Sequence, residues 1–112
     1  MTPTFRLTLL SALCTALAMP WAAVHAQTVL TPASERISDT AIHADYQAYE
    51  ATQGRIKALN DGGRRVRDYH LSKAQCWLDV SFHEYTRNDR SAFPQEALDQ
   101  SVRLIALMEQ KA

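Results

Sequence analysis

The sequence contains little cysteine: among its 112 residues, only Cys14 and Cys76 occur. We expect Cys14 to be removed with an N-terminal leader, which leaves Cys76 as a single thiol. One cysteine cannot build an internal disulfide framework, so the remaining thiol is either buried or pairs between chains. Burial is the favoured expectation, because unpaired cysteine is among the most buried residue types. An intermolecular disulfide through Cys76 is the alternative.

The sequence also lacks an apolar run of the roughly 20 residues that a membrane-spanning helix needs. Its longest apolar run covers residues 7–21 and follows the single basic residue Arg6. Val24 and Ala26 then supply the small residues of a cleavage site. This layout predicts a secretory signal peptide over residues 1–26, with an uncleaved anchor as the alternative. The mature chain is then a single exported domain over residues 27–112, without a stable membrane span.

Neither sign of charge is in excess, since 12 Lys and Arg side chains stand against 12 Asp and Glu side chains. Removal of Arg6 leaves 11 basic side chains against 12 acidic ones. A nearly neutral domain lacks the long-range field of a general nucleic-acid or membrane-surface binder. We therefore expect no nucleic-acid partner.

Motifs of catalysis and of metal binding are missing as well. The sequence has no Gly-x-Ser-x-Gly turn and no glycine-rich phosphate loop, and Cys76 has neither a glycine-rich nor a helix-start context that would activate it as a nucleophile. Cys76, Asp79 and His83 share one helix face, but paired zinc-binding motifs such as Cys-x-x-Cys are absent, and Asp79 and His83 lie in a solvated stripe. We expect no catalytic residues, no metal and no cofactor, and hence a protein that is not an enzyme.

What the sequence does contain is three helical periodicities, with no strand-like alternation after the leader. We expect helices over about residues 32–60, 65–86 and 92–110. Thr31 and Pro32 form one start signal for the first helix, and Ser38 offers a later cap. Gly62 and Gly63 end that helix, and residues 88–91 form the second turn.

Short connections between long helices make neighbouring helices antiparallel. The predicted fold class is therefore all-α, a three-helix antiparallel up-down-up bundle that follows a signal peptide. Its last two helices form a hairpin loosely similar to a tetratricopeptide helix pair, although one pair is not a repeat array. The second helix is apolar on two adjoining faces, which is typical of a helix with two partners. We expect it to lie in the middle of the molecule.

Two surface features are candidates for an interaction site. Arg64, Arg65 and Arg67 lie where the second helix is expected to begin, and arginines there oppose the helix dipole. Helix stability does not explain them, so they are suited to an anionic partner with carboxylate or phosphate groups. A solvated loop, partly neutralised by neighbouring acids, is the simpler interpretation. His70 and Trp77 lie on a secondary apolar seam, and we expect Trp77 to be partly exposed.

A set of residues near the centre of the sequence carries a resemblance to a known family. The pattern comprises Lys73-Ala74-Gln75, Trp77-Leu78-Asp79, Glu84-Tyr85 and Asn88-Asp89-Arg90-Ser91. It resembles the helical N-terminal region of certain OmpA-family envelope proteins of Gram-negative bacteria. In those proteins the helical region precedes a peptidoglycan-binding C-terminal domain, for which this sequence has no room. The resemblance therefore implies a helical envelope module, and peptidoglycan binding is not expected.

These observations predict a periplasmic, non-enzymatic, exported helical interaction module associated with the cell envelope. Its expected partner is a protein of the envelope or a second copy of the chain. The alternative is a self-assembling structural protein, a homodimer or larger helical bundle.

Overall fold

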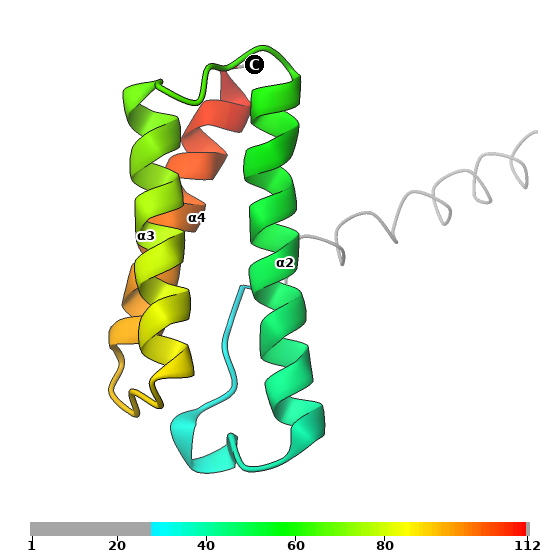
Figure 1. Cartoon of the computed structure of the whole chain (residues 1–112), viewed down its shortest axis with the longest axis vertical. Helices are drawn as coiled ribbons and strands as arrows, with labels where there is room; N and C mark the ends of the chain where they lie inside the picture. The colour runs from blue at the N-terminus through cyan, green and yellow to red at the C-terminus, as the bar shows by residue number, and fades with distance from the viewer. Residues whose placement is uncertain (1–27, 112) are drawn as a thin grey trace, which may run out of the picture.

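The computed structural model describes residues 28–111, which form three long helices and one short turn of 3-10 helix. The elements are η2 (Ala33–Glu35), α2 (Asp39–Asp61), α3 (Tyr69–Thr86) and α4 (Phe93–Gln110). The long helices run up, down and up (Figure 1), and no strand occurs between residues 28 and 111. The predicted all-α antiparallel bundle is therefore confirmed. The predicted signal peptide lies outside the described residues.

The first helix begins later than expected, at Asp39 rather than near residue 32. Ser38 has an extended backbone, and its Oγ accepts a hydrogen bond from the N–H of Ala41 at 3.2 Å, as a helix N-cap does. Thr31 does not cap a helix, because both its N–H and its hydroxyl donate to the Asp45 carboxylate, at 2.7 and 3.0 Å. This tertiary contact attaches the segment around Thr31 to the side of α2.

The second helix also begins later, at Tyr69 rather than at residue 65. Asp68 is its N-cap and accepts from the N–H of Leu71 at 3.0 Å. Residues 65–68 form a turn, in which Asp68 N–H donates to the carbonyl of Arg65. The third helix begins at Phe93, within one residue of the expected position. Between α3 and α4, Asn88 takes a left-handed backbone with φ of 63°, which asparagine tolerates well.

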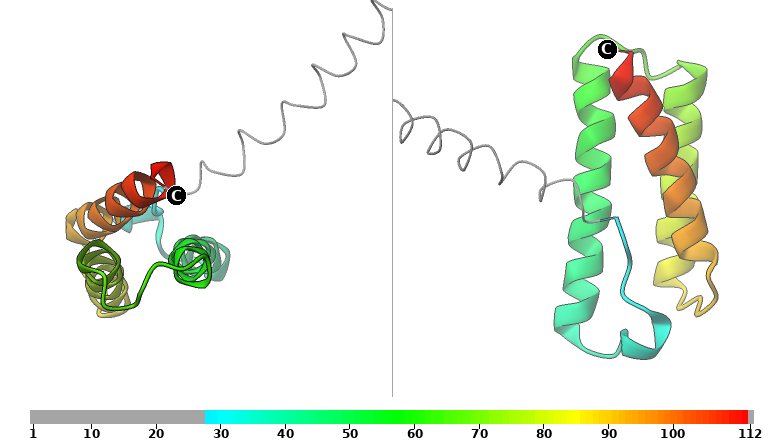
Figure 2. Two further views of the ribbon diagram at one scale, coloured as in Figure 1. Left: turned by 90° about the horizontal axis from the view of Figure 1, so that it is seen from above. Right: turned by 180° about the vertical axis from the view of Figure 1, so that it is seen from behind.

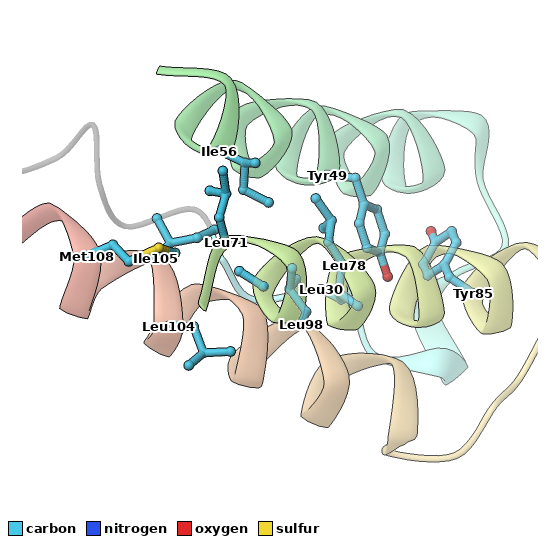
Figure 3. Packing of buried hydrophobic residues seen from close by; sticks show 11 residues of the cluster. Leu30, Tyr49, Ile56, Leu71, Leu78, Tyr85, Leu98, Leu104, Ile105 and Met108 are labelled. Carbon is cyan, nitrogen blue, oxygen red and sulfur yellow. The ribbon is translucent and has the colours of Figure 1, made fainter. Parts of the chain in front are cut away.

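The core is closest-packed between α3 and α4. Small side chains permit this approach: Ala74 and Ser101 are fully buried, and the Ser101 hydroxyl donates to the Ala74 carbonyl at 2.7 Å. Leucine, isoleucine and tyrosine side chains from all three helices fill the interior (Figure 3), and these are Tyr49, Ile56, Leu71, Leu78, Tyr85, Leu98, Leu104 and Ile105.

The three helices form a triangle rather than a row with α3 in the middle (Figure 2). α3 contacts both other helices, as its two apolar faces predict, but α2 and α4 are also in contact. A two-pronged ion pair joins them: Arg55 Nε and Nη2 lie 3.0 and 2.6 Å from the carboxylate oxygens of Glu109. The expectation of a sandwiched second helix is thus only partly correct.

A buried polar network fastens residues 28–36 to the end of the bundle where α2 begins. Asp45 is 2% exposed and accepts from Thr31 and from the Tyr85 hydroxyl. The Arg36 guanidinium lies over the Tyr85 ring, 4.4 Å from its centre, and Arg36 Nε lies 3.9 Å from Asp45 Oδ2. Leu30, which shows no clear pattern in the sequence, is buried in the core. Asp45, an acid within an apolar stripe, is therefore a structural residue.

Two tyrosines in this region predict a dependence of stability on alkaline pH. Burial raises the pKa of Tyr49, and burial together with the hydrogen bond to Asp45 raises the pKa of Tyr85. A raised pKa in the folded state means that the unfolded chain loses its phenolic protons first, near pH 10. The contribution of these two tyrosines to the free energy of unfolding is therefore fully present below about pH 10 and declines above it. Tyrosine absorbance near 295 nm, followed with circular dichroism, should show Tyr49 and Tyr85 ionising only as the helices melt. Ionisation of all tyrosines in a fully helical protein would contradict this.

Candidate functional site

The candidate site is the end of the bundle where α2 finishes, α3 begins and α4 finishes, at the top of Figure 1. Antiparallel helices bring these three termini together. We call this the basic end and define it as residues 55–74 and 103–111. The loop between α2 and α3, which carries the three predicted arginines, crosses it.

Backbone and side-chain hydrogen bonds fix the shape of this loop. Gly63 has φ of 113°, a conformation that favours glycine, and the N–H of Arg64 donates to the Leu59 carbonyl at 3.1 Å. The side-chain amide of Asn60 donates a hydrogen bond to the Arg64 carbonyl at 2.9 Å. The Ser72 hydroxyl donates to the Val66 carbonyl at 2.8 Å. The loop therefore presents its side chains from an ordered backbone.

The three arginines of the loop differ in their surroundings. Arg64 is half-buried and lies 3.4 Å from the carboxylate of Asp68. The N–H of Leu71 and the charge of Arg64 lower the pKa of Asp68, so this carboxylate is ionised at neutral pH. Arg65 and Arg67 are exposed and form no ion pair with any described residue. The loop thus keeps two of its three positive charges free for a partner.

Charge is strongly segregated along the bundle, although the whole chain is nearly neutral. The basic end holds eight cations and three carboxylates, for a formal charge of +5. The rest of the described chain holds three cations and nine carboxylates, for a formal charge of −6. In the basic end each carboxylate pairs with one cation: Asp61 with Lys57, Asp68 with Arg64, and Glu109 with Arg55. Five cations remain without an ion pair in the described region, and these are Arg65, Arg67, Lys73, Arg103 and Lys111.

This segregation corrects one premise of the sequence analysis. A net charge near zero was the reason to expect no long-range field. A field depends on how charges are distributed, and like charges within about 10 Å of one another reinforce each other at moderate salt. The basic end therefore presents a positive field of its own.

A hollow of about 310 Å³ lies within the basic end, between the start of α3 and the end of α4. Its rim is cationic: Lys73 belongs to α3, Arg103 to α4, and Lys111 directly follows α4. Arg64 of the loop also lines the hollow. Its wall is apolar, including the half-exposed Leu107. Positive charge beside apolar surface suits a partner that has both carboxylates and apolar side chains.

The other two predicted surface residues take different places. His70 is exposed and lines this hollow; its ring lies against that of Tyr69, with the ring centres 5.3 Å apart. Trp77 is half-buried, as expected, and packs against the core about two turns further along α3. It does not line the hollow. His70 therefore shares the hollow with Arg64, while Arg65, Arg67 and Trp77 do not line it.

The sequence analysis missed three cations of this surface: Lys73, Arg103 and Lys111. Lys73 lies only six residues after Arg67, early in the helix that follows the loop, whereas Arg103 and Lys111 are far away in sequence. Proximity in sequence would have found Lys73. The antiparallel topology would have found the other two, because it places the last turns of the third helix beside the first turns of the second.

Cys76 is exposed, which overturns the expectation that it is buried. It lines a second hollow, of about 530 Å³, between α2 and α3. The side chain lies at the border between the core face of α3 and its polar stripe, and α2 does not cover it. Whether the thiol pairs with another chain stays open as a prediction.

No group of three or more His, Cys, Asp or Glu side chains within residues 28–111 is arranged to hold a metal ion. None of the helices between residues 28 and 111 is long and apolar enough to cross a membrane.

Comparisons with protein-family models, with curated proteins and with solved structures give no match. The surface chemistry of the bundle is accordingly the main guide to its role.

Proposed function

We propose that this chain is an exported, non-enzymatic helical module that binds an acidic protein partner of the bacterial cell envelope through its basic end. One observation carries the proposal: five cations without ion pairs gather at one end of an otherwise acidic bundle, and three of them, Lys73, Arg103 and Lys111, line an apolar hollow there. Separating charge in this way costs stability through repulsion between like charges. A partner with acidic groups relieves that repulsion.

Export and envelope association are supported by features of the sequence. The layout of residues 1–26 is that of a secretory signal peptide, which would deliver the chain to the periplasm. The segment from Lys73 to Ser91 resembles the helical N-terminal region of OmpA-family envelope proteins.

The chemistry of the basic end favours a protein partner. Arginine forks pair with carboxylates through two parallel hydrogen bonds. The exposed Tyr69 and Leu107 add apolar contacts of the kind found in the centre of protein interfaces. An acidic helix or loop with interspersed apolar residues has the complementary composition.

A charge reversal at the basic end tests this proposal. We expect Arg67→Glu to lower the capture of envelope proteins by about tenfold, because the change removes one favourable charge and adds a repulsive one. The measurement is the amount of partner recovered after chemical crosslinking in intact cells. Capture by the natural chain should also weaken with added salt, since exposed charges are screened.

The matched control is Arg87→Glu, which makes the same charge change at an exposed position on the opposite end. We expect it to leave capture unchanged within about twofold, because Arg87 lies far from the hollow. Equal losses of capture in the two variants, or no loss in either, would contradict the proposal that the basic end binds the partner.

A second candidate function is self-assembly into a homodimer or larger bundle. The observation that favours it is the exposed apolar surface between α2 and α3, which includes Val66 and the free thiol of Cys76.

A further inference from the structure

The hollow between α3 and α4 combines positive charge and apolar surface within a small space. Among the described residues that line it, four are cationic and none carries a carboxylate. Arg64 shares its charge with Asp68 at 3.4 Å. Lys73, Arg103 and Lys111 form no ion pair with a described residue. An anion that enters the hollow therefore meets a clear excess of positive charge.

The cations reach the hollow from both helices, and local contacts hold two of them in place. The Lys73 ammonium lies 5.6 Å from the centre of the Tyr69 ring, and both side chains line the hollow. Arg103 donates from Nη2 to the side-chain oxygen of Gln100 at 2.9 Å, which limits the motion of its guanidinium. A guanidinium pairs with both oxygens of a carboxylate. The rim is therefore suited to a single carboxylate between α3 and α4.

The wall of the hollow is apolar and lies directly beside these cations. Leu104, Leu107 and Met108 line it from the last turns of α4. They are three and four residues apart, so they form one strip along the helix. Leu107 is exposed, whereas Leu104 and Met108 are buried. A ligand that satisfies both parts of the hollow needs an anionic group with an apolar group next to it.

The volume of the hollow limits what can enter. Its 310 Å³ corresponds to a space about 7 Å across, whereas an α-helix with its side chains is about 10–12 Å wide. Adjacent side chains of an extended chain point in opposite directions, so an internal acid and the apolar residue next to it do not enter together. The C-terminal residue of a chain differs, because its carboxylate and its side chain are attached to the same carbon atom.

We propose that the hollow between α3 and α4 binds the C-terminal carboxylate of the partner protein, with an apolar side chain on that last residue. The proposal rests on the proposed function and names the part of the partner that enters the hollow. Lys73 and Arg103 pair with the carboxylate, and the apolar side chain packs against Leu107. Arg65 and Arg67 do not line the hollow and are left to contact acidic residues further along the partner.

An NMR titration tests whether the hollow recognises a terminal carboxylate. The probe is acetyl-Gly-Leu with a free carboxylate, added to isotope-labelled protein produced from the full chain. We expect the amide signals of Leu104 and Leu107 to shift. Amidation of the carboxylate should raise the dissociation constant at least about tenfold, because it removes the charge. Acetyl-Glu-Gly amide carries only a side-chain carboxylate and should bind as weakly as the amidated probe.

Arg103→Gln locates the site. We expect this change to raise the dissociation constant for acetyl-Gly-Leu by about tenfold, because a charged hydrogen-bond donor is lost. The matched control is Arg87→Gln, an exposed arginine on the opposite end, which should change it by less than about twofold. Three outcomes would overturn the proposal: no binding of acetyl-Gly-Leu, equal binding of either amide probe, or equal effects of the two substitutions.

Photocrosslinking from the hollow distinguishes a protein terminus from a free carboxylate with a hydrocarbon chain, which shares the same chemistry. A photoreactive phenylalanine analogue replaces the exposed Leu107 in living cells, and mass spectrometry maps the product. We expect a crosslink to the last few residues of a protein. A crosslink to an internal segment would overturn the proposal. Binding of acetyl-Gly-Leu without any protein crosslink would also overturn it, and would assign the hollow to a free carboxylate.

Failure of this proposal differs from failure of the proposed function. If Arg67→Glu loses capture of the envelope partner and Arg103→Gln keeps it, the basic end binds a partner whose terminus does not enter the hollow. If Arg67→Glu and Arg87→Glu lose capture equally, both proposals are contradicted, even where acetyl-Gly-Leu binds.

Discussion

Replacing Asp45 by alanine should destabilise the protein by about 3–5 kcal/mol, the cost of removing one partner from a buried ion pair. The Asp45 carboxylate accepts hydrogen bonds from the N–H and hydroxyl of Thr31 and from the Tyr85 hydroxyl. The Arg36 side chain beside it is only 9% exposed. Without Asp45, that cation is left buried, and residues 28–36 lose their main attachment to α2. Urea denaturation followed by circular dichroism measures the loss.

Asp39→Ala is the control for Asp45→Ala. Asp39 is exposed in the first turn of α2, where an acid stabilises the helix end by about 0.3–1 kcal/mol. Hydrogen exchange adds a local reading: the Leu30 and Thr31 amides should lose protection in Asp45→Ala and keep it in the control. A loss of stability below about 1 kcal/mol in Asp45→Ala would mean that the network does not fasten the N-terminal segment.

The second large effect is expected at Leu98, in the second turn of α4. Leu98 is fully buried among side chains from all three helices (Figure 3). Leu98→Ala removes apolar contacts and leaves a cavity, which together cost about 2–5 kcal/mol. A domain of this size has only about 5–15 kcal/mol of total stability, so the variant should melt well below the natural chain.

Leu107→Ala on the same helix is the matched control, because Leu107 is 45% exposed. Leu107→Ala should change the free energy of unfolding by no more than about 0.5–1 kcal/mol. Similar losses in the two variants would show that α4 does not pack into the interior through Leu98.

Helix identity and order followed from apolar periodicity, but helix starts depended on contacts that the sequence does not display. Ser38 and Thr31 are both capping residue types, and local chemistry does not choose between them. Ser38 caps the helix because Thr31 instead donates hydrogen bonds to the carboxylate of Asp45, 14 residues further along the chain. Asp45 itself broke the apolar pattern of its helix, and such a break marks a residue whose partners come from elsewhere in the chain.

The exposure of Cys76 also depends on a tertiary contact that the sequence does not display. Periodicity placed the thiol at the border of the apolar face, where the position of a neighbouring helix decides whether it is covered. α2 packs against α3 less closely than α4 does, so the border with α2 stays open. For the basic end, the arginine loop and the nearby Lys73 were visible in the sequence, whereas Arg103 and Lys111 joined them only through antiparallel packing.

Site-specific photocrosslinking in living cells tests the central claim most directly. A photoreactive phenylalanine analogue is placed at position 67 in the basic end, and in a second strain at position 96 on the opposite end. The account predicts a crosslink from position 67 to an acidic protein of the envelope, and none to that protein from position 96. Equal crosslinking from the two positions, or crosslinking from position 96 alone, would contradict it.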